Sequence, residues 1–318
     1  MKIIVTGALG HIGSRLIREL PVAFPGCELV MIDDLSTQRY TSLFDLPDGG
    51  RYRFLQHDVQ QLDLGSLLAG ADALVHLAAI TDAAGSFDKA EQVEQVNFAG
   101  TIRVAEQCAA AGVPFLFLST TSVYGTQSDV VDEDCPESDL QPQSPYATSK
   151  LQAERALTEL GRTKGLRFIT CRFGTIFGVS PGMRFHTAVN KFIWQACQGI
   201  PITVWRSALD QRRPYLDLED GVRAINFIIE RGLFDNRVYN VLTINATVRD
   251  IVDAIRLHVP ELEAEFVDVR IMNQLSYTVR ADRFRDAGFV FQGDLQRAVA
   301  ATVRLLRNVA SRDVRIEV

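Results

Sequence analysis

The stretch VTGALGHIG, residues 5–13, restricts the fold of this chain more than any other part of the sequence. It places Gly7, Gly10 and Gly13 in the spacing GxxGxxG, between an apolar run that predicts a strand and a segment that predicts a helix. Such glycines allow a tight turn, a close approach of the backbone to a pyrophosphate, and close packing of helix on strand. The stretch therefore predicts a dinucleotide-binding turn; a tight turn without a ligand is the alternative.

An acidic residue after the second predicted strand indicates which dinucleotide is bound. Asp33 stands 20 residues after Gly13, at the end of the apolar run ELVMIDD. A carboxylate there accepts hydrogen bonds from the adenosine ribose hydroxyls and repels a 2′-phosphate. The expected cofactor is therefore NAD rather than NADP.

Short apolar runs alternate with helix-like segments through about residue 173, which predicts the fold class. The runs lack strict polar alternation, as expected of strands buried on both faces. We predict an α/β fold, a Rossmann-like doubly wound parallel sheet, with a smaller mixed C-terminal substrate-binding region. The predicted strands span residues 3–7, 28–34, 72–80, 114–120 and 166–173, and the clearest helices span 11–20, 93–111 and 145–160.

The alternation of strand-like and helix-like segments changes after residue 173. A loop rich in small residues is followed there by a helical segment and a strand-like PITVW. We predict an NAD-binding domain over residues 1–173, joined by roughly 213–241. The substrate-binding region is predicted over residues 174–212 and 242–318. The two regions are expected to interleave along the chain.

Composition excludes several classes of function. The formal net charge is −6, which argues against a nucleic acid or an acidic membrane surface as partner. The five cysteines and five histidines show no metal-ligand spacing, so no metal is expected. The N-terminal apolar run is too short for a signal peptide or a membrane span, and a cytoplasmic location is the default expectation.

The segment SPYATSKLQAERAL predicts a helix with Tyr146 and Lys150 on one face, because residues four apart are neighbours there. An ammonium near a phenol favours the phenolate, so the pKa of Tyr146 is expected to fall and Tyr146 to act as a general base. The strand at 114–120 ends in a run of hydroxyls that starts at Ser119. A hydroxyl at this end of a parallel strand faces the ligand crevice.

The stretches TGALGHIG, DALVHLAAI, VNFAGT, STTSVYG and YATSK together resemble the extended short-chain dehydrogenase/reductase family. The nearest resemblance is to its nucleotide-sugar epimerases and dehydratases, such as the UDP-galactose and UDP-glucuronate 4-epimerases, and it covers nearly the whole chain. The resemblance implies bound NAD, a nucleotide-sugar substrate, and a homodimer paired through the helices at 93–111 and 145–160.

The resemblance also implies residue roles. The implied catalytic residues are Tyr146, Lys150, which also binds the nicotinamide ribose, and Thr120. The implied cofactor-binding residues are Gly7, Gly10, His11, Ile12, Gly13, Asp33, Asp58, Val59, Leu77, Ala78, Ala79, Tyr146 and Lys150. The implied substrate-binding residues are Thr121, Ser122, Thr175, Arg184 and Arg213. His186 stands near Arg184 in the sequence and is a further candidate. Arg213 matches the arginine that binds the substrate diphosphate. Asn97 matches a structural asparagine of the family.

Two positions favour one reaction within this family. The 4,6-dehydratases that the chain resembles carry Asp-Glu directly after the catalytic threonine, whereas this chain carries Thr121 and Ser122, which supply no carboxyl group. What remains is reversible oxidation at one sugar carbon. The resemblance implies that this carbon is C4, and hence an NAD-dependent 4-epimerase that oxidises the C4 hydroxyl transiently and returns the hydride after the keto sugar rotates. An NAD(P)-dependent keto-sugar reductase and a non-catalytic dinucleotide-binding protein are the alternatives.

Overall fold

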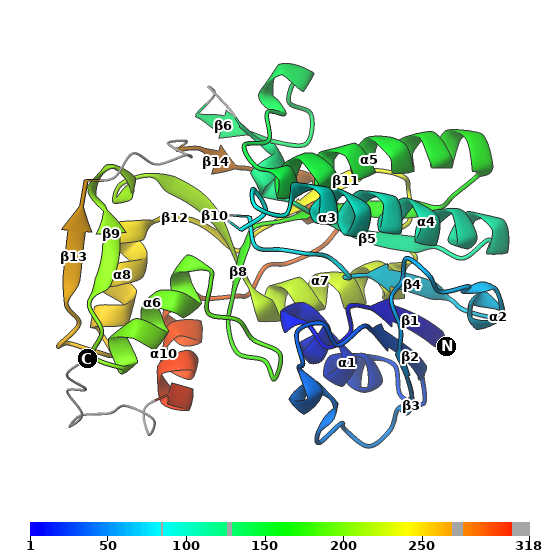
Figure 1. Ribbon diagram of the computed structural model, residues 1–318, viewed down its shortest axis with the longest axis horizontal. Coiled ribbons are helices and arrows are strands. Elements are labelled where there is room, and N and C mark those ends of the chain that lie inside the picture. The colour runs from blue at the N-terminus through cyan, green and yellow to red at the C-terminus, as the bar shows by residue number, and fades with distance from the viewer. Residues whose placement is uncertain (84, 126–128, 269–275, 307–318) are drawn as a thin grey trace.

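Seven parallel strands form the central sheet of the computed structural model, and helices cover both faces (Figure 1). The described residues are 1–83, 85–125, 129–268 and 276–306. Residues 269–275 and 307–318 of the predicted substrate-binding region lie outside them. Across the sheet the strands are β3 (Arg51–Gln56), β2 (Glu28–Asp33), β1 (Lys2–Thr6), β4 (Ala73–His76), β5 (Phe115–Thr120), β7 (Phe168–Phe173) and β11 (Val238–Val241).

This strand order confirms the predicted doubly wound sheet. From β1 the chain builds β2 and β3 on one side, and then crosses to β4 and its successors on the other. Neighbouring strands pair in parallel, so their carboxyl ends meet at one edge of the sheet. The connections leaving β1 and β4 diverge there, and open α/β sheets bind ligands at such a switch point.

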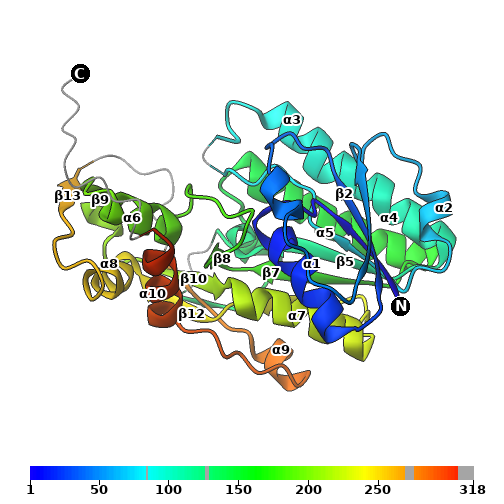
Figure 2. The ribbon, with the colours of Figure 1, turned by 90° about the horizontal axis from the view of Figure 1, so that it is seen from below.

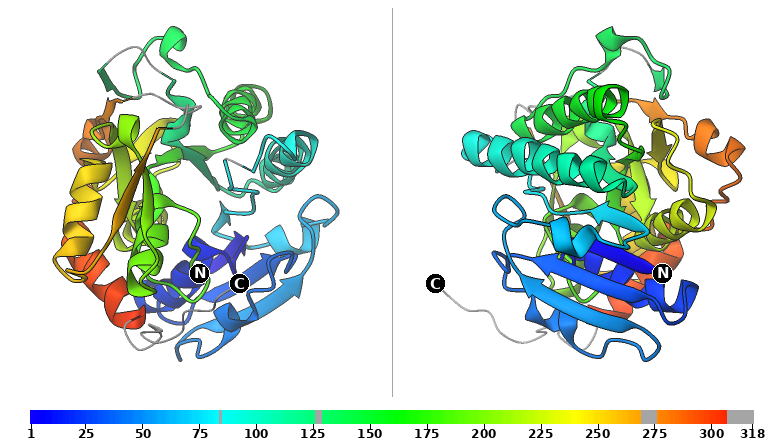
Figure 3. Two further views of the ribbon diagram at one scale, coloured as in Figure 1. Left: turned by 60° about the vertical axis from the view of Figure 1, so that its left-hand side comes forward. Right: turned by 90° about the vertical axis from the view of Figure 1, so that its right-hand side faces the viewer.

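The side chains of β1 alternate between two cores. Ile3 and Val5 pack on the side of α1 and α7, whereas Ile4 packs on the side of α4 and α5. Figures 2 and 3 show these two helix pairs against opposite faces of the sheet. The helices of this part of the chain are α1 (His11–Ala23), α2 (Gly65–Leu68), α3 (Ala90–Glu94), α4 (Gly100–Ala111), α5 (Pro145–Lys164) and α7 (Leu218–Arg231).

Two strands of the sheet were not predicted, and each differs from a buried apolar run. Arg51–Gln56 forms the edge strand β3, whose exposed and half-buried residues alternate because one side of it faces water. Val238–Val241 forms the opposite edge and contains only four residues. The predicted helices lie where expected, although α5 runs on to Lys164, where Gly165 ends it in a left-handed conformation (φ 69°).

A second hydrophobic core lies beyond the carboxyl edge of the sheet (Figure 1). The elements in and around it are β8 (Thr175–Phe177), α6 (Ala188–Cys197), β9 (Ile202–Trp205), β10 (Arg212–Asp217), β12 (Ile244–Thr247), α8 (Val248–Arg256), β13 (Ala264–Val267) and α10 (Leu295–Leu306). Three further short elements are β6 (Val130–Val131), β14 (Thr278–Val279) and α9 (Asp282–Asp286). The division into an NAD-binding and a substrate-binding region stays a prediction.

Among the residues that the structure describes, no helix combines the length and the apolar character needed to cross a membrane. No group of three or more His, Cys, Asp or Glu side chains among them could hold a metal ion. The five cysteines carry free thiols, and four of them are buried.

Buried His76 predicts how the fold responds to acid. The His76 ring is fully buried, with Nδ1 2.8 Å from the Thr6 hydroxyl and Nε2 3.0 Å from the Thr101 hydroxyl. Burial, aided by nearby Lys150, lowers its pKa from 6.5 to about 3. In the unfolded chain His76 therefore binds a proton as the pH falls below 6.5, whereas in the folded protein it stays neutral down to about pH 3.

Stability is thus expected to fall as the pH drops below 6.5. Protonation of His76 in the unfolded chain lowers the free energy of unfolding by about 2 kcal/mol between pH 7.5 and 5.0. We predict that His76→Gln reduces the difference in unfolding free energy between these two pH values by about this amount, measured by urea denaturation. An unchanged difference would show that His76 titrates normally in the folded protein.

Candidate active site

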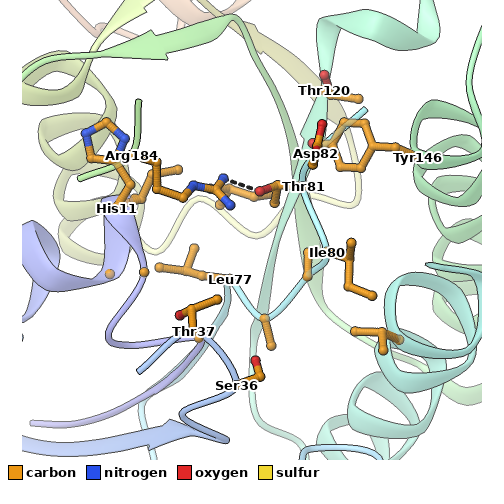
Figure 4. A pocket seen from close by; sticks show the side chains of 18 of the residues that line it. His11, Ser36, Thr37, Leu77, Ile80, Thr81, Asp82, Thr120, Tyr146 and Arg184 are labelled. Atoms are coloured by element: carbon orange, nitrogen blue, oxygen red, sulfur yellow. Dashed lines mark hydrogen bonds between the residues drawn. The ribbon is translucent and has the colours of Figure 1, made fainter. Parts of the chain in front are cut away.

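A cavity of about 430 Å³ opens at the switch point between β1 and β4 (Figure 4). The ends of β1, β2, β4 and β5 contribute to its walls, together with the first turns of α1 and α5 and the loop after β8. All the residues expected to bind the cofactor line it: Gly7, Gly10, His11, Ile12, Gly13, Asp33, Asp58, Val59, Leu77, Ala78, Ala79, Tyr146 and Lys150. Their contacts with a cofactor remain predicted.

The glycine loop fits a dinucleotide because no side chain covers its backbone N–H groups at the start of α1. No side chain caps this helix, whose N-cap is Gly10, so its first N–H groups remain available to an anion. Gly7 has a left-handed φ of 63°, and a Cβ there would lie 2.6 Å from the Ala78 nitrogen. A Cβ on Gly13 would lie 2.5 Å from the Gly7 oxygen. The turn can form in this way only with glycines.

The adenosine side of the cavity is built around Asp33. Its carboxylate accepts hydrogen bonds from the backbone N–H groups of Leu9 and Leu35, each at 3.0 Å, and so ties the glycine loop to β2. Burial raises the pKa of Asp33, and these two hydrogen bonds oppose the rise. Asp58 accepts from the Gln60 backbone at 2.8 Å. Sequence reasoning missed the lining residues Ser36, Thr37, Arg39 and Gln60, which lie in polar loops without a spaced motif.

The three expected catalytic residues meet in the cavity. Thr120 ends β5, and Tyr146 and Lys150 lie on the first turns of α5, which Ser144 caps by accepting the Ala147 N–H at 3.2 Å. Lys150 Nζ donates to the Leu118 oxygen at 2.8 Å and lies 4.6 Å from the centre of the Phe117 ring. The lysine is thereby anchored to the strand that presents Thr120.

The expected fall in the pKa of Tyr146 is wrong for the protein without ligands. Burial raises the pKa of Tyr146, while a hydrogen bond from Thr120 and the charge of Arg184 oppose that rise. Burial is decisive because it removes the water that would solvate a phenolate. Burial also lowers the pKa of Lys150 from 10.5 to about 7, against the charge of Glu154. The lysine therefore holds its proton far less firmly than a surface lysine.

The loop after β8 is fastened to the start of α1. The Ser180 hydroxyl donates to the His11 oxygen at 2.9 Å, and the Gly182 N–H donates to the Ser14 hydroxyl at 2.9 Å. His11 Nε2 lies 2.9 Å from the Gly178 oxygen, and burial lowers the pKa of His11 to about 4. The loop that carries Arg184 is thus held beside the predicted phosphate site.

Arg184 reaches into the cavity from this loop (Figure 4). It donates to the Thr81 hydroxyl, while its buried Nε has no hydrogen-bond partner. Burial and the charge of Arg39 lower the pKa of Arg184 to about 10, so it stays cationic at neutral pH. His186 lines the same wall, and burial lowers its pKa to about 4. A cation with an unsatisfied buried donor suits an anionic ligand group.

Ser122 and Thr175 also line the cavity, whereas two expected substrate-binding residues do not. Thr121 is buried and donates to the Phe173 oxygen at 3.3 Å, because the short turn after β5 directs its side chain toward β7. The Arg213 guanidinium lies 5.3 Å from the centre of the Tyr277 ring, outside the cavity lining.

Asn97 shapes the cavity wall from behind. It lies on a single π-helical turn, Gln95–Ala99, between α3 and α4. Its side chain accepts from the Ile80 N–H at 2.8 Å and donates to the Ile80 oxygen at 2.9 Å. Asn97 therefore fixes the loop after β4, in agreement with a structural role. The π-helical turn itself has no signal in the sequence.

A glycine loop at the switch point of a parallel sheet defines a dinucleotide-binding α/β protein. The model of the NAD-dependent epimerase/dehydratase family matches residues 3–241, and the chain belongs to this family of NAD-dependent enzymes.

Three comparisons illustrate this membership. The trifunctional UDP-glucose 4,6-dehydratase/UDP-4-keto-6-deoxy-D-glucose 3,5-epimerase/UDP-4-keto-L-rhamnose-reductase of Arabidopsis thaliana is 28% identical over 91% of this chain, but over only 44% of its own length. The uncharacterized UDP-glucose epimerase YtcB of Bacillus subtilis is 31% identical over 76% of each chain. The UDP-glucuronic acid 4-epimerase of Bacillus cereus, solved with UDP-glucuronic acid and NAD, has a TM-score of 0.86 and 25% identity, covering 97% of this chain and all of its own.

Proposed function

We propose that this protein is an NAD-dependent nucleotide-sugar 4-epimerase. The proposal is carried by the cavity in which Thr120, Tyr146 and Lys150 meet. The two residues after Thr120 carry hydroxyls instead of carboxyl groups: the Thr121 hydroxyl is buried and the Ser122 side chain lines the cavity. With bound NAD as the hydride acceptor, a proton acceptor and a hydroxyl relay suffice for reversible oxidation of an alcohol. Elimination of water needs in addition an acid to protonate the leaving hydroxyl.

In this mechanism Tyr146 receives the proton of the sugar C4 hydroxyl, and Thr120 hydrogen-bonds to the phenol oxygen and steadies the phenolate. NAD, when bound, supplies a hydride acceptor that later gives the hydride back, and its positive ring favours the phenolate. The glycine loop, Asp33 and Lys150 would hold it. The 4-keto sugar then turns within the cavity so that the opposite face of C4 meets the hydride donor, and Tyr146 returns the proton to the C4 oxygen.

The Arg184 side of the cavity favours a sugar with a carboxylate, as in UDP-glucuronate. A guanidinium with an unpaired buried Nε gains most from a carboxylate, which accepts two parallel hydrogen bonds. The Bacillus cereus relative, solved with UDP-glucuronic acid, agrees with this preference. Arg213, outside the cavity, is proposed to reach the diphosphate of the bound substrate.

Replacing Arg184 tests this preference. We expect Arg184→Met to raise KM for UDP-glucuronate by about tenfold or more, since a charge-assisted hydrogen bond to a buried ion contributes about 1.5–3 kcal/mol. KM for UDP-glucose should change by less than about threefold. Steady-state kinetics with both sugars measure this, and Arg212→Met, which removes an exposed arginine of β10, is the matched control. Equal losses with both sugars would contradict a carboxylate site.

A 4,6-dehydratase is the second candidate. The Arabidopsis relative carries this activity in its name, and Asp82 provides a carboxylate in the cavity wall. Asp82 lies in the loop after β4 and accepts from the Gly85 N–H at 3.1 Å. It is therefore the residue to replace if water elimination is observed.

The proposal is tested by incubating the protein, without added cofactor, with a panel of UDP-, dTDP- and GDP-sugars, UDP-glucuronate included, followed by NMR. Appearance of a C4 epimer at constant total sugar, with no NADH accumulating, is expected. Conversion that requires NADH or NADPH and a keto sugar would instead place the protein among reductases. No turnover under either condition would favour a non-catalytic role.

We also propose that the protein is a cytoplasmic homodimer. The helices α4 and α5 lie side by side on one face of the sheet (Figure 3) and would pair with the same helices of a second copy. Light scattering coupled to size-exclusion chromatography should give a mass of twice 35.3 kDa. A mass of one chain at micromolar concentration would overturn this.

A further inference from the structure

A buried ion pair lies outside the cavity lining and is joined to it through Ser119, the neighbour of Thr120 on β5. Glu154 on α5 and Arg172 on β7 are both 4% exposed. Arg172 Nη2 donates to Glu154 Oε2 at 2.6 Å, and Nε donates to Oε1 at 3.1 Å. Two charges so deeply buried are costly to desolvate and rarely add net stability over apolar residues of similar size.

The pair is built to hold one carboxylate in place. Arg172 is itself fixed, because Nη1 donates to the Tyr124 hydroxyl at 2.8 Å and the guanidinium lies over the Tyr124 ring. On its other side Glu154 accepts a hydrogen bond from the Ser119 hydroxyl. Ser119 stands on β5 between Leu118, whose oxygen accepts from Lys150, and Thr120. The Glu154 carboxylate is therefore locked against the strand that anchors the catalytic lysine.

Glu154 is also the acidic group next to Lys150. It lies one helical turn further along α5, on the same face. Tyr146, His76 and Tyr124 carry no negative charge at neutral pH, whereas Asp82 brings a carboxylate to the cavity that Lys150 also lines. Burial keeps Tyr146 protonated and His76, from β4, neutral, and burial raises the pKa of Tyr124. Arg172 lies behind Glu154 and adds positive charge. The Glu154 carboxylate is the group that favours a charged Lys150 against burial.

We propose that Glu154 is a positioning residue: it is the internal counter-charge of Lys150, and the ion pair with Arg172 holds it in place. An ammonium buried to 3% exposure, which contacts a backbone oxygen and an aromatic face, needs a fixed negative charge nearby to remain an ammonium. The proposed function uses this lysine as a cation. The charge of Lys150 is a property of the free protein, and it can be measured without any reaction.

The test is a direct titration of Lys150 in the cofactor-free protein. The chain contains five lysines, so ¹³C-labelled lysine gives a simple spectrum in which Lys150→Met identifies the relevant Cε signal. In Glu154→Gln, which keeps the shape but removes the charge, the midpoint of this signal should fall by about one pH unit. In Ser119→Ala, which cuts the link to β5 but keeps the ion pair, the midpoint should stay close to that of the unaltered protein.

Glu154→Gln leaves Arg172 buried without its partner, so this variant can fold poorly. A second variant avoids that difficulty. Glu154→Gln combined with Arg172→Gln removes both charges and should recover much of the lost thermal stability. Its Lys150 midpoint should still lie below that of the unaltered protein, but above that of Glu154→Gln alone. A midpoint unchanged in the double variant would overturn the proposal and leave Glu154 as a structural ion pair only.

Discussion

Tyr146→Phe is expected to lower turnover by a factor of about a thousand or more while leaving NAD affinity within about threefold. The change removes one oxygen and keeps the aromatic ring that lines the cavity. A general acid or base contributes typically about 10²–10⁴-fold, and the phenol is the group that can take the proton of the sugar hydroxyl. Turnover is measured with the sugar that the NMR panel identifies, and NAD binding by calorimetry.

The control for this prediction is a second tyrosine on a neighbouring element. Tyr124 is buried near the same strand end but outside the cavity lining, and its hydroxyl bonds to Asn240 at 2.9 Å. Tyr124→Phe should lower the unfolding temperature with little effect on turnover. Retained turnover in Tyr146→Phe would exclude the proposed mechanism, and a matching loss in Tyr124→Phe would point to a general loss of structure.

The second large effect is expected from Gly13→Ala. The new Cβ would lie 2.5 Å from the Gly7 oxygen and 2.7 Å from two atoms of Ala8, all of them backbone atoms that no side-chain rotation can move. Either the glycine loop or α1 must shift, at a cost of about 2 kcal/mol or more. NAD affinity should fall more than about a hundredfold, because the N–H groups aimed at the pyrophosphate move with the loop.

Gly10→Ala separates the loss of stability from the loss of NAD affinity. A Cβ at Gly10 would meet the Gly7 oxygen at 3.3 Å, a contact that a small adjustment relieves. This variant should keep its unfolding temperature within a few degrees but still bind NAD weakly, because the added methyl group stands where the backbone approaches the pyrophosphate. Tight NAD binding by both variants would contradict a cofactor site at this loop.

The central strands could be predicted because burial on both faces leaves a plain apolar run in the sequence. Edge strands escape this rule: β3 is half exposed and charged, and β11 has four residues. The stretch at residues 177–185 was predicted as a loop, but its attachment to α1 depends on contacts between residues more than 160 positions apart. No local pattern encodes such a contact.

The site was predictable where chemistry depends on spacing along one element, as with Gly7 and Gly13 in one turn, or Tyr146 and Lys150 on one helix face. Arg39 and Asp82 reach the cavity from loops whose course is set by tertiary packing. The direction of the Tyr146 pKa was wrong because spacing shows neighbours but not burial, and burial has the larger effect here.

The central claim is that hydride leaves C4 of the sugar and returns to the same carbon. It is tested most directly with UDP-glucuronate and UDP-glucose carrying deuterium at C4, with the product read by NMR and mass spectrometry. The account predicts a C4-inverted product that keeps its deuterium at C4. Deuterium at C6 of a 4-keto-6-deoxy product would show a 4,6-dehydratase, and loss of deuterium to water would show proton abstraction from carbon; either result would contradict the account.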